Sequence, residues 1–188
     1  MNMARSWRWA TVRFAIAAVL GTGLVASPTM TAQAFSAGSG GVTPQSYTYY
    51  RVVARHSGKC LDVAGNSHSN GDNLQQYTCN GGPNQQWRLL FYLSSGGGWY
   101  EIIVASTGKC LDIEGASRAD RAMAQQYTCH GGDNQLFQLV FADSGGYYAF
   151  VARHSGKCLD VEGDLLTDHA KVWQYTCDYD RNQLWGFF

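Results

Sequence analysis

The octapeptide HSGKCLDV occupies residues 56–63, and it returns as STGKCLDI at residues 106–113 and as HSGKCLDV at residues 154–161. The copies begin at positions 56, 106 and 154, so the period is 50 residues and then 48. Self-similarity at a fixed period of this size is the sequence signature of a repeat architecture. Each Cys-Leu-Asp block therefore marks one unit of a chain that is built three times over.

Two further blocks recur in step with the first. A Gln-Tyr-Thr-Cys block places its cysteine 19 positions after the first one in every copy, so no copy carries an insertion between them. A third block closes each unit at residues 84–87 (NQQW), 134–137 (NQLF) and 182–185 (NQLW). The three units therefore correspond block by block, and they are expected to fold alike.

Short strand-like runs are found in every unit. Tyr49–Ala54, Trp99–Ala105 and Tyr147–Ala152 are rich in aromatic and β-branched residues, and glycines separate them at 96–98 and 145–146. Units of this length form either a short solenoid or a closed three-fold assembly. With so few repeats and no polar capping unit, a barrel that hides its strand edges is favoured. The sequence predicts an all-β fold.

The N-terminus has the pattern of a secretory signal peptide. Three arginines and no acidic residue precede the apolar run 14–26, which is too short to span a bilayer as an anchor. A small-x-small triplet follows at 32–34 and predicts cleavage before Phe35. We expect a signal peptide at residues 1–34, a flexible lead-in at 35–46 and one domain at 47–188, with repeats at about 47–95, 96–144 and 145–188.

Charge argues against a nucleic-acid partner. Residues 1–34 carry three of the 14 basic side chains and none of the 14 acidic ones, which leaves 11 against 14 in the predicted mature chain. The remaining lysines and arginines are scattered, whereas a protein that binds phosphate backbones needs them clustered. The sequence therefore predicts a secreted protein with no nucleic-acid binding and no membrane insertion.

All six cysteines lie in the predicted mature chain, in a compartment where disulfides persist. Six cysteines allow 15 connectivities. The equal spacing makes the pairs within each repeat the most economical choice, and it predicts Cys60–Cys79, Cys110–Cys129 and Cys158–Cys177.

Strand alternation then assigns side chains to faces. Asp62 shares a face with Cys60, while Leu61, Val63 and Leu74 point to the core. If the bridged strands are antiparallel with their cysteines opposed, Asp62 lies opposite Tyr77, and the same holds in the other repeats. The alternative to a ligand-binding role is that each aspartate caps a turn through its own backbone, and that each tyrosine is a core residue. Trp87, Phe137 and Trp185 are predicted core residues.

A carboxylate, an amide and an aromatic ring together suit a sugar. The carboxylate accepts hydrogen bonds from adjacent hydroxyls, the amide donates and accepts, and the ring supports the less polar face of the sugar. Gln76, Gln126 and Gln174 fall on the predicted core face, where a buried amide needs internal partners.

The order Cys-Leu-Asp, an aromatic residue two before the second cysteine, then Gln-x-Trp, three times over, resembles the ricin B-type lectins and the related xylan-binding modules of actinobacterial enzymes. The resemblance covers residues 47–188 and implies a β-trefoil, a six-stranded barrel capped by three hairpins. It implies a first sugar site of Asp62, Gln75, Tyr77 and Asn84, braced by Gln85. It implies a second of Asp112, Gln125, Tyr127, His130, Asn134 and Gln135, and a third of Asp160, Tyr175, Asn182 and Gln183. Trp173 replaces the amide in the third site, which is expected to be altered or silent.

An enzyme is disfavoured, because catalysis needs unlike groups, whereas the same aspartate recurs three times in like surroundings. No nucleophile–histidine pair and no metal-ligand spacing recurs, so no cofactor or metal is expected. The alternative is a protein-binding trefoil, such as a protease inhibitor or a toxin-delivery subunit, which would use one long loop. The sequence predicts a non-catalytic, monomeric protein that binds carbohydrate of galactose or xylose type.

Overall fold

The computed structural model describes residues 47–94, 97–143 and 145–188. The predicted signal peptide (1–34) and lead-in (35–46) lie outside these residues. Within the described part, no helix is long and apolar enough to cross a membrane.

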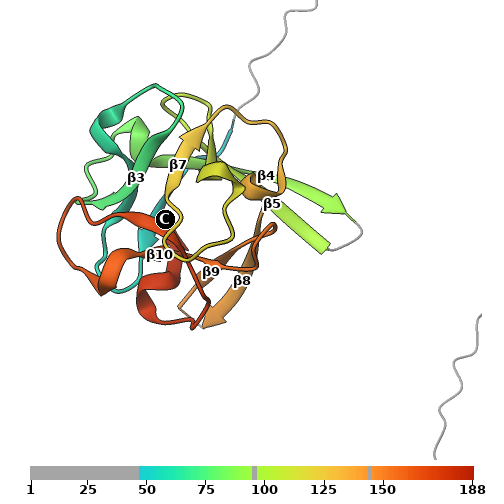
Figure 1. Ribbon diagram of the computed structural model, residues 1–188. Coiled ribbons are helices and arrows are strands. Elements are labelled where there is room, and N and C mark those ends of the chain that lie inside the picture. The colour runs from blue at the N-terminus through green and yellow to red at the C-terminus, as the bar shows by residue number, and fades with distance from the viewer. Residues whose placement is uncertain (1–46, 95–96, 144) are drawn as a thin grey trace, which may run out of the picture. The chain divides into compact units, whose positions relative to one another are not determined.

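Each repeat contributes four β-strands in the same order (Figure 1). The first repeat holds β1 (Tyr50–Ala54), β2 (Cys60–Val63), β3 (Asp72–Tyr77) and β4 (Gln86–Ser94). The second holds β5 (Gly97–Val104), β6 (Cys110–Ile113), β7 (Ala124–Tyr127) and β8 (Phe137–Asp143). The third holds β9 (Tyr147–Ala152), β10 (Cys158–Val161), β11 (Val172–Tyr175) and β12 (Leu184–Phe187). The prediction of an all-β fold is confirmed.

Short 3₁₀ turns link these strands. One follows the second strand of each repeat, as η1 (Ala64–Asn66), η3 (Glu114–Ala116) and η5 (Glu162–Asp164). Another precedes the fourth strand, as η2 (Pro83–Gln85), η4 (Asp133–Gln135) and η6 (Arg181–Gln183). The second set carries the Asn-Gln of the third sequence block.

Strand pairing closes the sheet. Followed from strand to strand, the pairings pass through β1, β2, β3, β7, β6, β5, β8, β9 and β12 and return to β1. β4 shortens this circuit, because it pairs with both β5 and β1. The N–H of Arg51 and the N–H of Phe188 each donate to the carbonyl of the other residue, at 2.8 and 3.0 Å, so the first and last strands lie side by side. Closure leaves these strands without free edges.

The residues predicted to form the core do so. Leu61, Val63 and Leu74 are fully buried, and so are Trp87, Phe137 and Trp185. The indole Nε1 of Trp87 donates to the carbonyl of Leu61 at 3.0 Å, and Trp185 repeats this contact with Leu159. The buried indoles therefore keep their hydrogen bonds, as burial requires.

The disulfides are those predicted, and they correct the predicted strand register. Cys60–Cys79, Cys110–Cys129 and Cys158–Cys177 are bonded. Cys60 lies opposite Tyr77, and Asp62 lies opposite Gln75, so the predicted pairing of Asp62 with Tyr77 is wrong. Cys79 lies two residues beyond the end of β3, so the disulfide runs diagonally between the two strands. The observed register therefore differs by two residues from the one predicted with the cysteines opposed. The other repeats show the same register.

The three buried glutamines tie each repeat to the one before it. Gln76 is fully buried, and its Nε2 donates to the carbonyls of Leu165 (2.6 Å) and Thr167 (2.9 Å) in the third repeat. Its Oε1 accepts a hydrogen bond from Ser57 Oγ at 2.7 Å. The partners of the other two are the carbonyls of Ser67 and Ser69 for Gln126, and those of Ser117 and Ala119 for Gln174. These amides therefore find internal partners, and their contacts run in a ring through the three repeats.

Candidate functional site

Three pockets lie beside the Cys-Leu-Asp strands, one at each aspartate. The pocket at Asp62 (first pocket) has a volume of about 380 Å³, and the one at Asp112 (second pocket) about 350 Å³. The pocket at Asp160 (third pocket) is larger, at about 690 Å³. Each opens between its own repeat's strands and the loop that enters the Asn-Gln turn.

The carboxylate of Asp62 is the centre of a network of amides. Gln75 Nε2 donates to Oδ1 at 2.8 Å, while Asn84 Nδ2 and Gln85 Nε2 donate to Oδ2 at 2.8 and 2.9 Å. Asp62 is only 3% exposed, and this burial raises its pKa although the three amides oppose the rise. An ionised carboxylate has about four acceptor positions, so one remains, on Oδ1.

The second and third pockets repeat this arrangement. Asp112 accepts from Gln125, Asn134 and Gln135 at 2.8–2.9 Å. Asp160 accepts from Asn182 and Gln183 at 3.0 Å on Oδ2, and from Trp173 on Oδ1. A carboxylate with one remaining acceptor position is therefore common to all three pockets.

Trp173 takes the place of the amide in the third pocket. Its Nε1 donates to Asp160 Oδ1 at 2.7 Å, as Gln75 Nε2 does to Asp62. The indole keeps the donor and loses the amide's acceptor. Burial raises the pKa of Asp160 to about 6, and the nearby charge of Asp178 adds to the rise. The pocket remains open beside the larger ring.

The glutamines of the Asn-Gln turns lie behind the aspartates. Gln85, Gln135 and Gln183 have no exposed surface. Each donates to its aspartate and to the carbonyl of the threonine in the second block, and each accepts a backbone N–H of the following loop. They brace the pocket, and none of the three has surface exposed in it.

The tyrosines of the second block lie at the surface. Tyr77 and Tyr175 are half-buried and line their pockets, and Tyr127 is 39% exposed. The alternative that they are core residues is therefore wrong. Each offers an aromatic face beside an aspartate.

His130 lines the second pocket. The N–H of Gly132 donates to its Nδ1 at 3.1 Å, so Nε2 carries the proton, 3.5 Å from Asp112 Oδ2. The ring packs edge-to-face with that of Tyr127. The side chains of Asn80 and Asp178 accept a loop N–H in the same way in the other repeats. This position therefore shapes the turn, and in the second repeat it also reaches the pocket.

Residues from neighbouring repeats complete two pockets, and the sequence did not indicate them. His169 of the third repeat lines the first pocket, and Arg121 of the second repeat lines the third pocket together with His56 and Arg181. His169, Arg121 and His56 belong to other repeats than the aspartates that they approach, and of these three only His56 is part of a repeated block, the octapeptide at 56–63.

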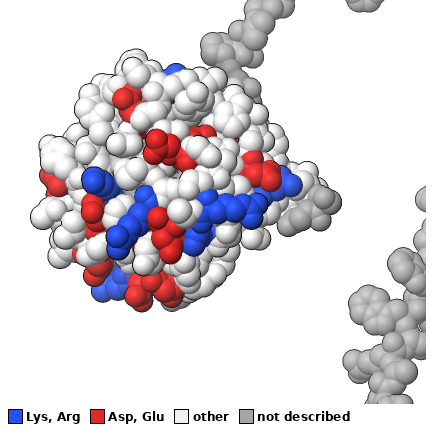
Figure 2. All heavy atoms as spheres, in the orientation of Figure 1, with Lys and Arg blue, Asp and Glu red and all other residues white. Residues whose placement is uncertain are grey.

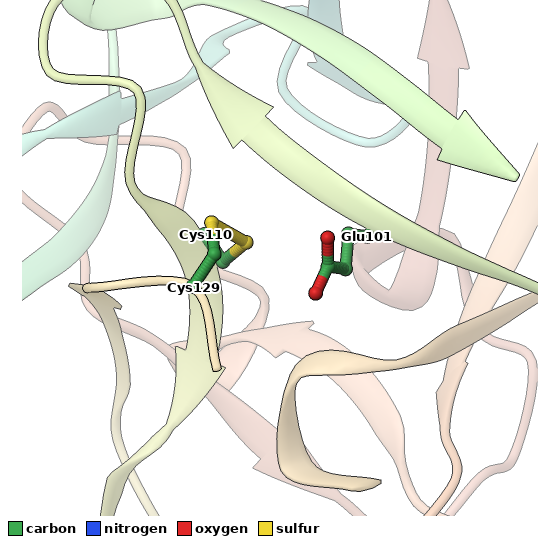
Figure 3. A group of neighbouring side chains, drawn as sticks. All are labelled: Glu101, Cys110 and Cys129. Atoms are coloured by element: carbon green, nitrogen blue, oxygen red, sulfur yellow. A yellow bond between two sulfur atoms is a disulfide. The ribbon is translucent and has the colours of Figure 1, made fainter. Parts of the chain in front are cut away.

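A group with the composition of a metal site lies away from the pockets. Glu101, Cys110 and Cys129 have their ligand atoms within 4.8 Å of one another (Figure 3). Both sulfurs belong to a disulfide, and Tyr92 Oη donates to Glu101 Oε2 at 2.9 Å. A disulfide sulfur is not the thiolate that a metal needs, so these residues do not fit a metal ion.

Basic and acidic side chains are interspersed on the face shown in Figure 2. Among the described residues, Lys59 pairs with Asp168 at 2.7 Å and Lys157 pairs with Asp120 at 2.6 Å. Both pairs join neighbouring repeats, and the lysines lower the pKa of the two carboxyls. The charges of Lys59 and Lys157 are therefore locally compensated.

Comparisons with known proteins connect this arrangement to lectins. The family model described as ricin-type beta-trefoil lectin domain-like matches residues 31–94, 90–175 and 133–188. The designed three-fold symmetric protein ThreeFoil is 50% identical, with a TM-score of 0.70 over 74% of this chain and 96% of that one. No curated protein sequence matches the chain.

Two natural proteins are similar over part of their length. The exo-beta-1,3-galactanase 1,3Gal43A from Clostridium thermocellum is 34% identical, with a TM-score of 0.69, over 77% of this chain. The hemolytic lectin CEL-III is 30% identical, with a TM-score of 0.61, over 74% of this chain. In both cases the match spans only 30% of the other protein's chain.

Proposed function

The chain belongs to the ricin-type β-trefoil lectin domain-like family, and on this premise we propose that it binds carbohydrate without catalysis, through up to three pockets. The family and its lectin members connect the chain to carbohydrate binding in general. The proposal goes further and assigns the binding to the pockets of Asp62, Asp112 and Asp160.

One observation carries the proposal: each pocket presents a buried carboxylate that three neighbouring donors hold in place, beside an exposed aromatic face. Three donors fix the direction of the remaining acceptor position on Oδ1, so a sugar hydroxyl meets a preorganised group. The tyrosine supports the less polar face of the sugar ring. The same geometry at Asp112 and Asp160 supports three similar sites rather than one specialised centre.

The proposed ligand residues are those whose side chains line the pockets. We propose that the aspartates, the tyrosines and the asparagines of the turns contact sugar, together with Gln75, Gln125 and His130, while the turn glutamines act from behind. Trp173 gives the third pocket a different preference, because an indole offers a donor and a wide apolar face but no acceptor.

Galactose or xylose units are the proposed ligands. A β-1,3-galactanase is among the similar structures, and this supports galactose-containing glycans. Its catalytic activity is not transferred, because the match spans 30% of that chain. The repetition of one aspartate in like surroundings supports a binding protein, since catalysis needs unlike groups.

We further propose that the protein is secreted as a monomer after removal of residues 1–34, with the lectin domain at 47–188, and that it binds neither nucleic acid nor membranes. Three disulfides support an oxidising destination. The closed circuit of β1, β4, β5, β8, β9 and β12 supports a six-stranded barrel, with the other strands as three hairpins.

A glycan array probed with the mature protein tests the proposal. We expect binding to galactose- or xylose-containing glycans, and loss of binding in the triple variant Tyr77→Ala, Tyr127→Ala, Tyr175→Ala. Gln138→Ala, at an exposed position on β8, is the control and should bind as the parent does. Retention of the protein by an immobilised protease, with no signal on the array, would favour the protein-binding alternative.

A further inference from the structure

One position in each repeat reaches across to the pocket of the next. Gly71, Arg121 and His169 each lie shortly before the third strand of their repeat, and their φ angles are +85°, +67° and +69°. Their N–H groups donate to the carbonyls of Gln126, Gln174 and Gln76, at 2.9, 2.8 and 3.0 Å. The backbone thus holds three equivalent residues, each against the third strand of the next repeat. The pocket tyrosine of that repeat lies on the same strand.

His169 is fixed beside the first pocket. Its Nδ1 lies 3.1 Å from Gln75 Oε1, and its ring packs edge-to-face with that of Tyr77, with centroids 5.0 Å apart at 65°. Its side chain also lines the pocket. Three independent contacts therefore place this imidazole next to the amide and the aromatic ring that are proposed to hold the sugar.

The hydrogen bonds determine which imidazole nitrogen faces a ligand. Gln75 Nε2 donates to Asp62 Oδ1, so the other end of this amide is the acceptor Oε1. His169 Nδ1 must donate to that oxygen and therefore carries the proton. Nε2 is left with a lone pair, and it has no hydrogen-bond partner among the residues that the structure describes. Asp62 thus fixes the tautomer of His169 through Gln75.

The other two pockets differ at this position. Gly71 offers no side chain to the second pocket, although a Cβ there would lie 3.7 Å from Gln125 Oε1, in ordinary contact. In the third pocket the guanidinium of Arg121 lies over the ring of Trp173, 5.8 Å from its centroid. Each pocket thus has an equivalent aspartate, but the residue contributed by the neighbouring repeat differs: His169 in the first, Gly71 in the second and Arg121 in the third.

We propose that His169 is a further sugar-binding residue of the first pocket, whose Nε2 accepts a hydrogen bond from a hydroxyl of a galactose unit lying on Tyr77. The inference rests on the proposed function and adds to it a contact that the third repeat makes for the first. The first pocket thus recognises one sugar hydroxyl through His169. The second pocket has Gly71 at the equivalent position and no acceptor for that hydroxyl.

The test isolates the first pocket in a Tyr127→Ala, Tyr175→Ala background. His169→Phe keeps a ring against Tyr77 and lacks both nitrogens, and His169→Gly reproduces the second pocket. Isothermal titration with galactose and its 2-, 3-, 4- and 6-deoxy forms measures each affinity, and a thermal scan verifies folding. A neutral hydrogen bond contributes a factor of about three to ten in affinity. We expect this loss for galactose in both variants, and equal affinity of parent and variants for the one deoxy sugar that lacks the contacted hydroxyl.

Two results would overturn the inference. Unchanged galactose affinity would show that Nε2 makes no contact, and an equal loss for galactose and all deoxy forms would show that His169 only positions Gln75. If the background protein does not bind galactose but the array still shows glycan binding, this inference fails and the proposed function stands. No glycan binding by the unmodified protein would overturn both.

Discussion

Replacing Asp112 by alanine should affect both the fold and the second pocket, whereas replacing Tyr127 should affect the pocket alone. Asp112 is 2% exposed and accepts from three amides, those of Gln125, Asn134 and Gln135. Tyr127 is 39% exposed, and its ring packs edge-to-face with that of His130. The two side chains flank one pocket, so the pair separates a supporting contribution from a ligand-contacting one.

The magnitude follows from the hydrogen bonds that are lost. Each buried donor left without an acceptor costs roughly 1–3 kcal/mol, and the low end applies here because water can enter from the pocket. Three donors give about 3 kcal/mol for Asp112→Ala. For a domain of this size the melting temperature changes by roughly 2–4 °C per kcal/mol, so a fall of about 6–12 °C is expected. Tyr127→Ala should cost less than about 1 kcal/mol, as is usual for surface substitutions.

Differential scanning calorimetry measures the stability, and titration with galactose measures the second pocket in a Tyr77→Ala, Tyr175→Ala background. Both variants should lose this binding. The reasoning is refuted if Asp112→Ala melts at the parent's temperature, because the amide network would then contribute nothing. It is also refuted if Tyr127→Ala binds as the parent does, because the aromatic face would then not be part of the site.

Three further predictions concern other parts of the molecule. Gln76→Leu removes three buried hydrogen bonds and should cost about 3 kcal/mol in urea unfolding, whereas Gln86→Leu, with one bond to Gly81, should cost less than about 1 kcal/mol. Because the folded state holds a proton on Asp160 up to about pH 6, stability from this group is present below its ordinary value near pH 4 and lost as the pH rises through 6. Parent and Asp160→Asn should therefore differ in the change of melting temperature between pH 4.5 and 7, and identical changes would contradict the raised pKa. Polysaccharide should bind up to ~10²-fold more tightly than monosaccharide to the unmodified protein, and equal affinity per site in titrations would exclude multivalent binding.

The sequence predicted those features that recur in every copy. Equal cysteine spacing identified the disulfides, and strand alternation identified Leu61, Val63 and Leu74 as core residues. The register was wrong because we assumed that bonded cysteines oppose one another, whereas Cys79 lies beyond β3 and Cys60 faces Tyr77. Spacing along the chain does not distinguish a diagonal bridge from a direct one.

Contacts between repeats could not be predicted for a different reason. His169 and Gln75 are 94 positions apart, and the residues equivalent to His169 are Gly71 and Arg121, which share no chemistry. What they share is a positive φ, and glycine alone would have suggested that conformation from sequence. The two acceptors of Gln76 Nε2 are backbone carbonyls, which leave no trace in side-chain identity.

The pairing of Arg51 with Phe188 makes the starting point of the domain arbitrary. The buried glutamines join the first repeat to the third by the same kind of contact that joins the second to the first and the third to the second. A circularly permuted chain, with residues 47 and 188 joined by a short linker and new ends opened between the second and third repeats, would keep every strand pairing and disulfide described above. The domain could therefore be inserted into another protein with its two ends placed at any repeat boundary, and its three pockets would be retained.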